Sequence, residues 1–294
     1  HELAQTHSVP LVPMVQAFES ESPHGLIGHD LMLEHLHPNL RGYFIMGRAF
    51  AEAMQQHGFV SDKWFPERAR PDSVYWQERG VTPLDEEVAR IRIAVLKDSW
   101  PFVPKNKPRA FVYAPRNEFE KLASATWQRE LTWEEAHVKI AEQYSNARQF
   151  AEAAREYEAL ILETPYNVSP YVRAGLLYLA MDDSQRAFKR LWQSLQIEPT
   201  AEANKYVGSI LVDRKDAQHG VPYLEKAVAM NPYDTQTLYN LTGAYLMLGK
   251  ADKAAVALAS LEKLSRSGKE LEELKQLLAN VQAAQSHKTK LTEN

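Results

Sequence analysis

The sequence contains no cysteine, which excludes a disulfide framework and any metal site built on thiolates. Only 12 of its 294 residues are glycine, whereas strong helix formers are abundant, so the composition favours helix. No apolar run reaches the length of about 18 residues that a membrane helix needs. No segment has the pattern of a signal peptide. We therefore expect a largely helical chain without a membrane segment. These absences do not decide between a cytoplasmic and a periplasmic location.

An excess of charge of one sign is also missing. The formal net charge is -4 and the sequence pI is about 6.2, with no dominant basic stripe, which argues against nucleic acid as a partner. The shares of hydrophobic residues (45%) and charged residues (24%) are typical of globular proteins, and the length suits roughly two domains. We predict no cofactor.

The second half of the chain is repetitive. Similar sequence segments end at Pro165, Pro199 and Pro232. Proline ends a helix because it lacks an amide hydrogen. Each unit between them holds two apolar runs with a period of about 3.6 residues, which predicts a pair of helices joined by a tight turn.

These units resemble tetratricopeptide repeats over about residues 134 to 265, as four repeats within a segment 132–265. Small residues recur where the two helices of a pair would approach closely: Ala141, Gly175, Gly208 and Thr242 in the first helices, Ala153, Ala187, Gly220 and Ala254 in the second. The resemblance implies a mainly α fold, a right-handed superhelix of helical hairpins. Within residues 266–294, the run GKELEELKQLLANVQAA predicts a capping helix, and the polar tail after it is expected to be loose.

The same resemblance implies a concave groove that binds a protein or peptide. The family's groove positions correspond here to Val172, Leu176, Lys205, Ser209, Tyr239, Leu246 and Met247. Chaperone-binding members hold a carboxylate with Lys, Asn and Arg, and only Lys205 fits that pattern, so we argue against such a clamp. A mixed groove with Tyr239 and Met247 suits an amphipathic segment. The alternative is that the apolar residues pack against the capping helix.

Residues 58–131 are interpreted as a helical connector. Thr82 as N-cap and Pro83 at the first position predict a helix that runs to about residue 100. A second helix is expected over residues 117–131. Thr132 and Glu135 have the spacing of a capping box, which predicts the start of the first repeat.

The front piece, residues 1–57, reads as a short helix, a strand, a loop rich in histidine and a final helix. The strand is predicted in VPLVPMV, residues 9–15, and the final helix begins near Asn39. This order predicts a small partial α/β segment, in which a functional loop would follow the carboxyl end of the strand. An uncovered sheet edge there predicts self-association or a missing covering segment.

The stretch EHLHPNLRGYFIMG resembles the closing motif of SGNH (GDSL-type) hydrolases, with Glu34, His37, Pro38, Asn39 and Gly42 as the matching residues. The resemblance implies that His37 acts as the general base and that Glu34, where the family usually has Asp, fixes its tautomer. The glycine-aspartate-serine block and the oxyanion residues of that family have no counterpart before His37. Glu34 and His37 are therefore catalytic only with a serine supplied upstream, and the chain alone is predicted to be inactive.

Two other roles for the histidines remain open. His24, His29, His35 and His37 cluster in sequence with Asp30 and Glu34, but their spacing fits no standard zinc pattern, so we predict no metal. Alternatively the loop only caps the following helix through Asn39, an interpretation that is favoured for His35. The leading functional hypothesis is a protein-interaction scaffold. The alternative is the C-terminal portion of an SGNH-type serine esterase that acts on acylated glycans or lipids.

Overall fold

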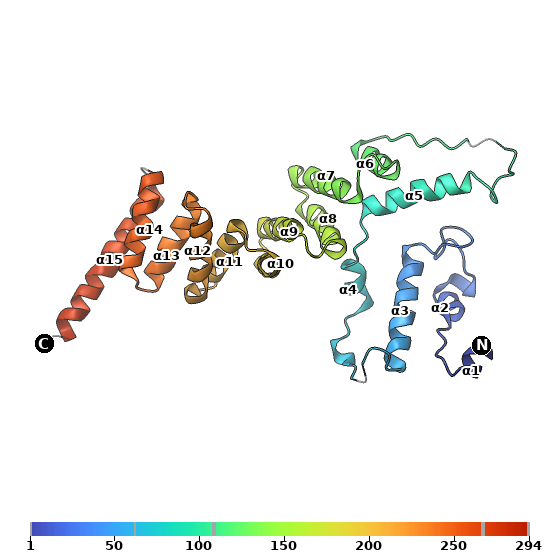
Figure 1. Cartoon of the computed structure of the whole chain (residues 1–294), viewed down its shortest axis with the longest axis horizontal. Helices are drawn as coiled ribbons and strands as arrows, with labels where there is room; N and C mark the ends of the chain where they lie inside the picture. The colour runs from blue at the N-terminus through green and yellow to red at the C-terminus, as the bar shows by residue number, and fades with distance from the viewer. Residues whose placement is uncertain (1, 62, 108–109, 266–267, 293–294) are drawn as a thin grey trace. The chain divides into compact units, whose positions relative to one another are not determined.

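The computed structural model describes residues 2–61, 63–107, 110–265 and 268–292 (Figure 1). The described residues form two compact units, one of residues 1–79 and 89–112 and the other of residues 80–88 and 113–294. The boundary passes through helix α5 (Pro83–Lys97), whose first turns belong to the second unit. We call the first the front unit and the second the repeat unit. No helix in the described part is long and apolar enough to cross a bilayer.

The repeat unit consists of four helix pairs and a last helix. The pairs are α7 (Trp133–Asn146) with α8 (Phe150–Glu163), α9 (Val168–Ala180) with α10 (Ser184–Ile197), α11 (Ala201–Asp213) with α12 (Ala217–Met230) and α13 (Thr235–Met247) with α14 (Ala251–Leu264). The first helices begin at Trp133, Val168, Ala201 and Thr235, so they recur every 35, 33 and 34 residues. This tetratricopeptide-type architecture confirms the repeat prediction.

Local sequence signals explain where these helices begin. The side chains of Thr132, Asn167, Thr200 and Asp234 each accept a backbone N–H bond in the first turn of α7, α9, α11 and α13, which satisfies a donor that the helix leaves unpaired. Thr132 and Glu135 complete the predicted capping box. Within each pair the turn contains one residue with positive φ, at Arg148, Asp182, Lys215 and Gly249.

Close contact within the pairs depends on the small residues that the sequence analysis singled out. A Cβ atom added to Gly208 would lie 2.7 Å from Cγ of Leu224 and 3.0 Å from the carbonyl oxygen of Gly220. One added to Gly175 would lie 2.6 Å from Cγ of Leu191. Both leucines are fully buried, so these positions have no room for a larger residue.

Helix α15 (Lys269–Thr292) covers the end of the array, as predicted for a capping helix. Leu271 and Leu274 are buried in the same apolar cluster as Leu241 and Leu258. The tail expected to be loose is helical as far as Thr292, which extends the helix beyond the prediction. The predicted segment boundary at residue 266 lies outside the described residues.

The front unit contains α1 (Glu2–Thr6), α2 (Met14–Glu21), α3 (Leu40–Gln56), α4 (Asp72–Gln77), the later turns of α5 and two short 3-10 turns, Pro23–Gly25 and Pro66–Arg68. Helices α2 and α3 pack side by side (Figure 1). Their contact buries a small cluster of Phe18, Leu31 and Ile45.

The strand predicted over residues 9–15 is wrong, and with it the α/β assignment of this segment. Residues 9–13 have no regular structure and α2 begins at Met14. The described residues contain no sheet, only one isolated bridge between Met32 and Pro38. A strand needs a neighbour for its backbone groups, and Pro10 and Pro13 lack the amide hydrogens that such pairing uses.

The helices predicted in residues 58–131 are present. Helix α5 begins at Pro83, and the hydroxyl of Thr82 accepts the amide of Leu84 at 3.2 Å. Helix α6 (Glu118–Trp127) has Asn117 as its N-cap. Helix α4 was not predicted.

Candidate functional site

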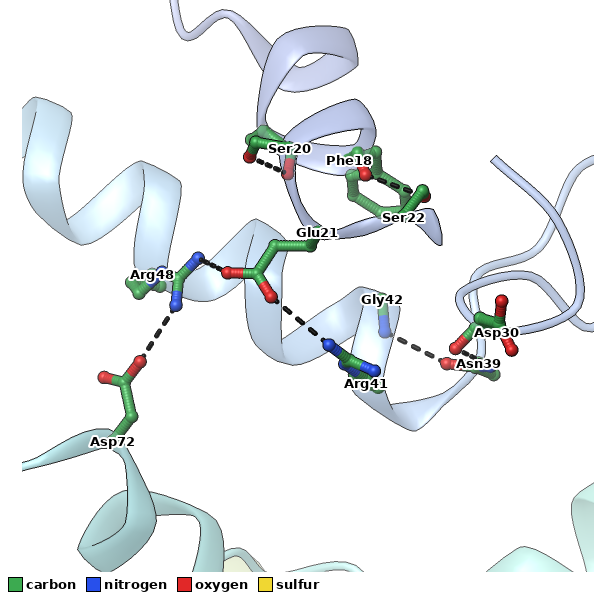
Figure 2. A network of polar contacts seen from close by, with 11 residues as sticks. Phe18, Ser20, Glu21, Ser22, Asp30, Asn39, Arg41, Gly42, Arg48 and Asp72 are labelled. Atoms are coloured by element: carbon green, nitrogen blue, oxygen red, sulfur yellow. Dashed lines mark hydrogen bonds and ion pairs between the residues drawn. The ribbon is translucent and has the colours of Figure 1, made fainter. Parts of the chain in front are cut away.

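The loop before α3 is held in place by the residues of the sequence motif. Asn39 is the N-cap of α3, because its side-chain oxygen accepts the amide of Gly42 at 3.0 Å. Its side-chain nitrogen donates to the carbonyl oxygen of Asp30 at 2.9 Å (Figure 2). It also donates to the carbonyl oxygen of His29 at 3.1 Å. A Cβ atom on Gly42 would lie only 2.4 Å from the carbonyl oxygen of Leu31. The loop therefore packs directly on the backbone of α3.

This loop brings Glu34 and His37 together, as the resemblance predicted. The Glu34 carboxylate is buried and accepts the amides of Leu36 and His37, both at 2.9 Å. It also pairs with Nδ1 of His37 and, at 2.8 Å, with Nδ1 of His35. Burial alone would raise the pKa of Glu34, but the hydrogen bonds from His37 and from the two amides lower it. The acid is thus held as a carboxylate beside the imidazole.

The His37 ring is half exposed, and Nε2 has no hydrogen-bond partner among the described residues. An imidazole that donates from Nδ1 to a carboxylate presents Nε2 as a base. The hydroxyls of Ser20 in α2 and of Ser22, its C-cap, donate instead to the carbonyl oxygens of Ala17 and Phe18. The described residues do not gather three His, Asp or Glu side chains into a potential metal site.

The predicted groove residues of the repeat unit do not share one environment. Val172 and Leu246 are buried in the apolar clusters, 7% and 8% exposed. Leu246 belongs to the same cluster as α15 residues Leu271 and Leu274. The alternative interpretation, packing that involves the capping helix, therefore describes Leu246.

Lys205 and Ser209 are engaged in contacts between α11 and the next repeat. The Lys205 ammonium lies 2.9 Å from a carboxylate oxygen of Asp234, and Ser209 accepts the side-chain amide of Asn240 at 2.6 Å. Burial would raise the pKa of Asp234, but Lys205 and the amide of Thr237 lower it. Lys205 is thus neutralised by an acid of its own chain.

Leu176 lines a hollow to which α7, α8 and α9 all contribute residues. It shares the hollow with two charged residues that sit on opposite helices, Glu142 on α7 and Arg173 on α9. Neither charge has a hydrogen bond or ion pair with any described residue. Asn146 and Phe150 also line it. We call this the α7–α9 hollow. Arg173 was not among the predicted groove residues, although its place one turn before Leu176 could have shown it.

Tyr239 lines a second hollow, formed by α13, α14 and the start of α15, together with Gln236 and Leu261. Met247, at the end of α13, is 58% exposed. The structure therefore places Leu176 and Tyr239 in two separate hollows and leaves Met247 exposed at the end of α13, outside both. The paired polar residues Lys205 and Ser209 lie between Leu176 and Tyr239 in the sequence.

Comparisons with known proteins find limited similarity. No family model matches the chain. The BBSome complex member BBS4 homolog of Drosophila melanogaster is 28% identical over 131 residues, which are 44% of this chain and 26% of that protein. The chain thus spans about a quarter of that relative's length.

Solved structures similar to the chain include the MamA protein, with 20% identity and a TM-score of 0.47 over 53% of this chain and 86% of that one. Another is YrrB, a TPR protein with an unusual peptide-binding site, with 15% identity and a TM-score of 0.45 over 59% of this chain and 98% of that one. The repeat architecture of the present chain rests on its own helix pairs, their period and their small residues.

Proposed function

We propose that the chain is a protein-interaction scaffold that binds a peptide segment of a partner on the first helices of its repeats. The observation that carries the proposal is the α7–α9 hollow, where an apolar side chain, Leu176, shares the lining with an acid and a base. Neither of these charges is paired with a described residue. Such a surface offers burial to an apolar residue and charge complementarity on either side of it. Val172, Leu176, Lys205, Ser209, Tyr239, Leu246 and Met247 remain the predicted groove set. Within it we assign direct contact to Leu176, Tyr239 and Met247.

The ligand class follows from these groups. Arg173 attracts a carboxylate and Glu142 a cationic side chain, while Leu176 and Phe150 favour an apolar residue between them. The expected ligand is a segment with an acidic residue, an apolar residue and a basic residue in close succession.

A peptide library displayed on phage and selected on the immobilised full chain tests this proposal. We expect selected peptides to share the acidic, apolar and basic pattern and to lose at least tenfold in affinity for Leu176→Asp. The pair Tyr239→Ala and Met247→Asp should weaken peptides long enough to reach α13. Val256→Asp is the control, because Val256 is 71% exposed on α14. Selected peptides that bind all these folded variants equally would reject the assignment.

A second candidate function is favoured by the pairing of Glu34 with His37. In this alternative the chain is the C-terminal portion of an SGNH-type serine esterase, and His37 takes a proton from a serine hydroxyl supplied by a preceding segment. Its substrates would be acylated glycans or lipids, as the resemblance implies. Glu34 holds the imidazole through Nδ1, which leaves Nε2, unpaired among the described residues, to accept that proton.

Histidine-selective NMR on the present chain tests the geometry of this pair. Neutral His37 should carry its proton on Nδ1, and Glu34→Gln should shift the tautomer balance, whereas Glu19→Gln on α2 should not. Hydrolysis of p-nitrophenyl acetate tests the chemistry in a longer chain that includes a glycine-aspartate-serine block upstream. Loss of turnover in His37→Ala would support the base role, and full turnover would contradict it.

A further inference from the structure

The first turns of α5 lie against the first repeat, on which α6 also packs. Thr82 and Leu84 are almost completely buried, 0% and 1% exposed. Arg155 of α8 donates to the carbonyl oxygen of Val81 at 2.8 Å. A Cβ atom on Gly80 would lie 3.8 Å from Cβ of Leu162. We call residues 80–88 the end segment.

A buried histidine joins this segment to the repeat. His137 on α7 is fully buried. Its Nδ1 lies 2.6 Å from Oε2 of Glu156 on α8, and its Nε2 lies 3.3 Å from Oδ1 of Asp85 in the end segment. Asp85 also accepts the indole N–H of Trp133 at 2.7 Å and the amide of Thr82 at 2.8 Å.

Both ring nitrogens of His137 face carboxylates, and only the doubly protonated ring can donate to both. Burial would lower the pKa of His137, but Asp85 and Glu156 outweigh it and raise the pKa to about 9. Burial would likewise raise the pKa of Asp85, but His137, Thr82 and Trp133 lower it. At neutral pH His137 is therefore an imidazolium that donates to both Asp85 and Glu156.

A buried ion cluster is an energetically costly contact between two elements, because its charges lose their hydration. Apolar residues of similar volume often stabilise such a contact equally well. Here Oε1 of Glu156 is buried and has no hydrogen-bond partner among the described residues. Removal of one member leaves the others as uncompensated buried charge. The contact is thus strongly destabilised when any one of its groups is lost.

We propose that the end segment is a detachable cap of the repeat array, and that the Asp85–His137–Glu156 cluster is the latch that keeps it closed. Opening separates Asp85 from His137 and exposes the face of the first repeat that carries Trp133 and His137. The proposal goes beyond the scaffold function and does not depend on the α7–α9 hollow.

The direction of the pH dependence follows from the raised pKa. The stabilisation by the latch is complete below the unfolded pKa of about 6.5 and is lost as the pH rises through about 9. Asp85 contributes in the opposite direction: its stabilisation is present above its unfolded pKa and is lost as the pH falls through its lowered folded value. The cap should therefore open toward alkaline pH while the repeats remain folded.

The absence of cysteine allows a site-specific test. In the full chain, Leu84→Cys reports opening of the cap through its rate of reaction with a thiol reagent, and Leu224→Cys, at a fully buried position in the third repeat, reports unfolding of the repeats. Rates are divided by the reactivity of free cysteine at the same pH. We expect Leu84→Cys to react at least tenfold faster than Leu224→Cys, and faster still as the pH passes 9.

Variants of the latch complete the test. Asp85→Asn should raise the reaction rate of Leu84→Cys at least tenfold without changing that of Leu224→Cys, and His137→Gln should act in the same way where it folds. Glu152→Gln, an exposed acid on α8, is the matched control and should change neither rate. Equal rates at the two cysteines, or equal responses of both to Asp85→Asn, would overturn the proposal.

Discussion

The front unit and the repeat unit are stabilised in different ways. In the repeat unit, apolar clusters run through all four helix pairs into α15, with contacts repeated from one pair to the next. In the front unit, the cluster of Phe18, Leu31 and Ile45 is small, and polar contacts join its helices. Arg48 of α3 bonds to Glu21 of α2 at 2.7 Å and to Asp72 of α4 at 2.9 Å (Figure 2).

The comparison shows how a sequence of ordinary composition can produce a regular core in one region and a sparse one in another. The repeats bury apolar residues against sequence neighbours, so each pair supports the next. The front unit relies on partly exposed ion pairs, which contribute little each and are screened by salt. The Arg48 guanidinium lowers the pKa of Glu21, through a hydrogen bond that outweighs its partial burial.

The largest expected effect is on the close contact between α11 and α12. Gly208→Ala places a Cβ atom 2.7 Å from Leu224 and 3.0 Å from a carbonyl oxygen, so we expect the free energy of unfolding of the repeat unit to fall by about 2 to 3 kcal/mol. Gly243→Ala in α13 is the control, because nothing lies within 4 Å of its added Cβ, and it should be neutral or stabilising. Urea denaturation followed by circular dichroism measures both. Equal effects would contradict the tight packing.

A parallel substitution probes the front unit. Gly42→Ala places its Cβ atom 2.4 Å from the carbonyl oxygen of Leu31 and 2.8 Å from Cβ of Pro38. We expect it to displace the Glu34–His37 loop and to destabilise the front unit by about 2 kcal/mol. Gly47→Ala in the same helix meets nothing within 4 Å and should leave the loop intact. Hydrogen exchange of the Leu36 and His37 amides reports the loop; protection retained in Gly42→Ala would refute this packing.

A smaller effect is expected at the turns within the pairs. Lys215 has a φ of 66° and Gly249, at the same place in the fourth repeat, has 65°. Because only glycine adopts this conformation without strain, Lys215→Gly should stabilise the repeat unit by roughly 0.5 to 1 kcal/mol. Gly249→Ala should destabilise it by a similar amount. Thermal unfolding of the two variants measures both changes in stability. A loss of stability in Lys215→Gly would contradict the argument.

The smallest expected effect is a difference between the two units in how amide exchange responds to salt. Raising the ionic strength should speed amide exchange in α2 and α3 by about twofold, since surface ion pairs contribute at most about 1 kcal/mol, and leave α9 to α12 unchanged. Arg48→Met should remove most of this salt response. An equal salt response in both units would contradict the conclusion that ion pairs stabilise the front unit more than the repeat unit.

What the sequence predicts correctly is mostly local. The repeat period, the small residues, the caps at Thr132 and Asn39 and the pairing of Glu34 with His37 all depend on residues close in sequence. The strand at residues 9–15 was predicted from β-branched composition, but the described residues hold no neighbouring strand to pair with it.

The rest depends on contacts that no periodicity encodes. His137 reaches Asp85 across 52 positions, and no motif indicated that contact. The groove set was predicted by register alone, which cannot distinguish Leu246, buried in the core, from Leu176, which lines a hollow. Arg173 was missed because charged residues on exposed helix faces are common.

The most direct test of the scaffold account is a charge exchange at the α7–α9 hollow. The affinity of a selected peptide is measured by isothermal titration calorimetry for the unchanged chain, for Arg173→Glu and for Lys189→Glu, a matched reversal on the exposed face of α10. The account predicts a loss of at least tenfold for Arg173→Glu alone, restored when the peptide's acidic residue is replaced by lysine. Equal affinities for all three chains would contradict it.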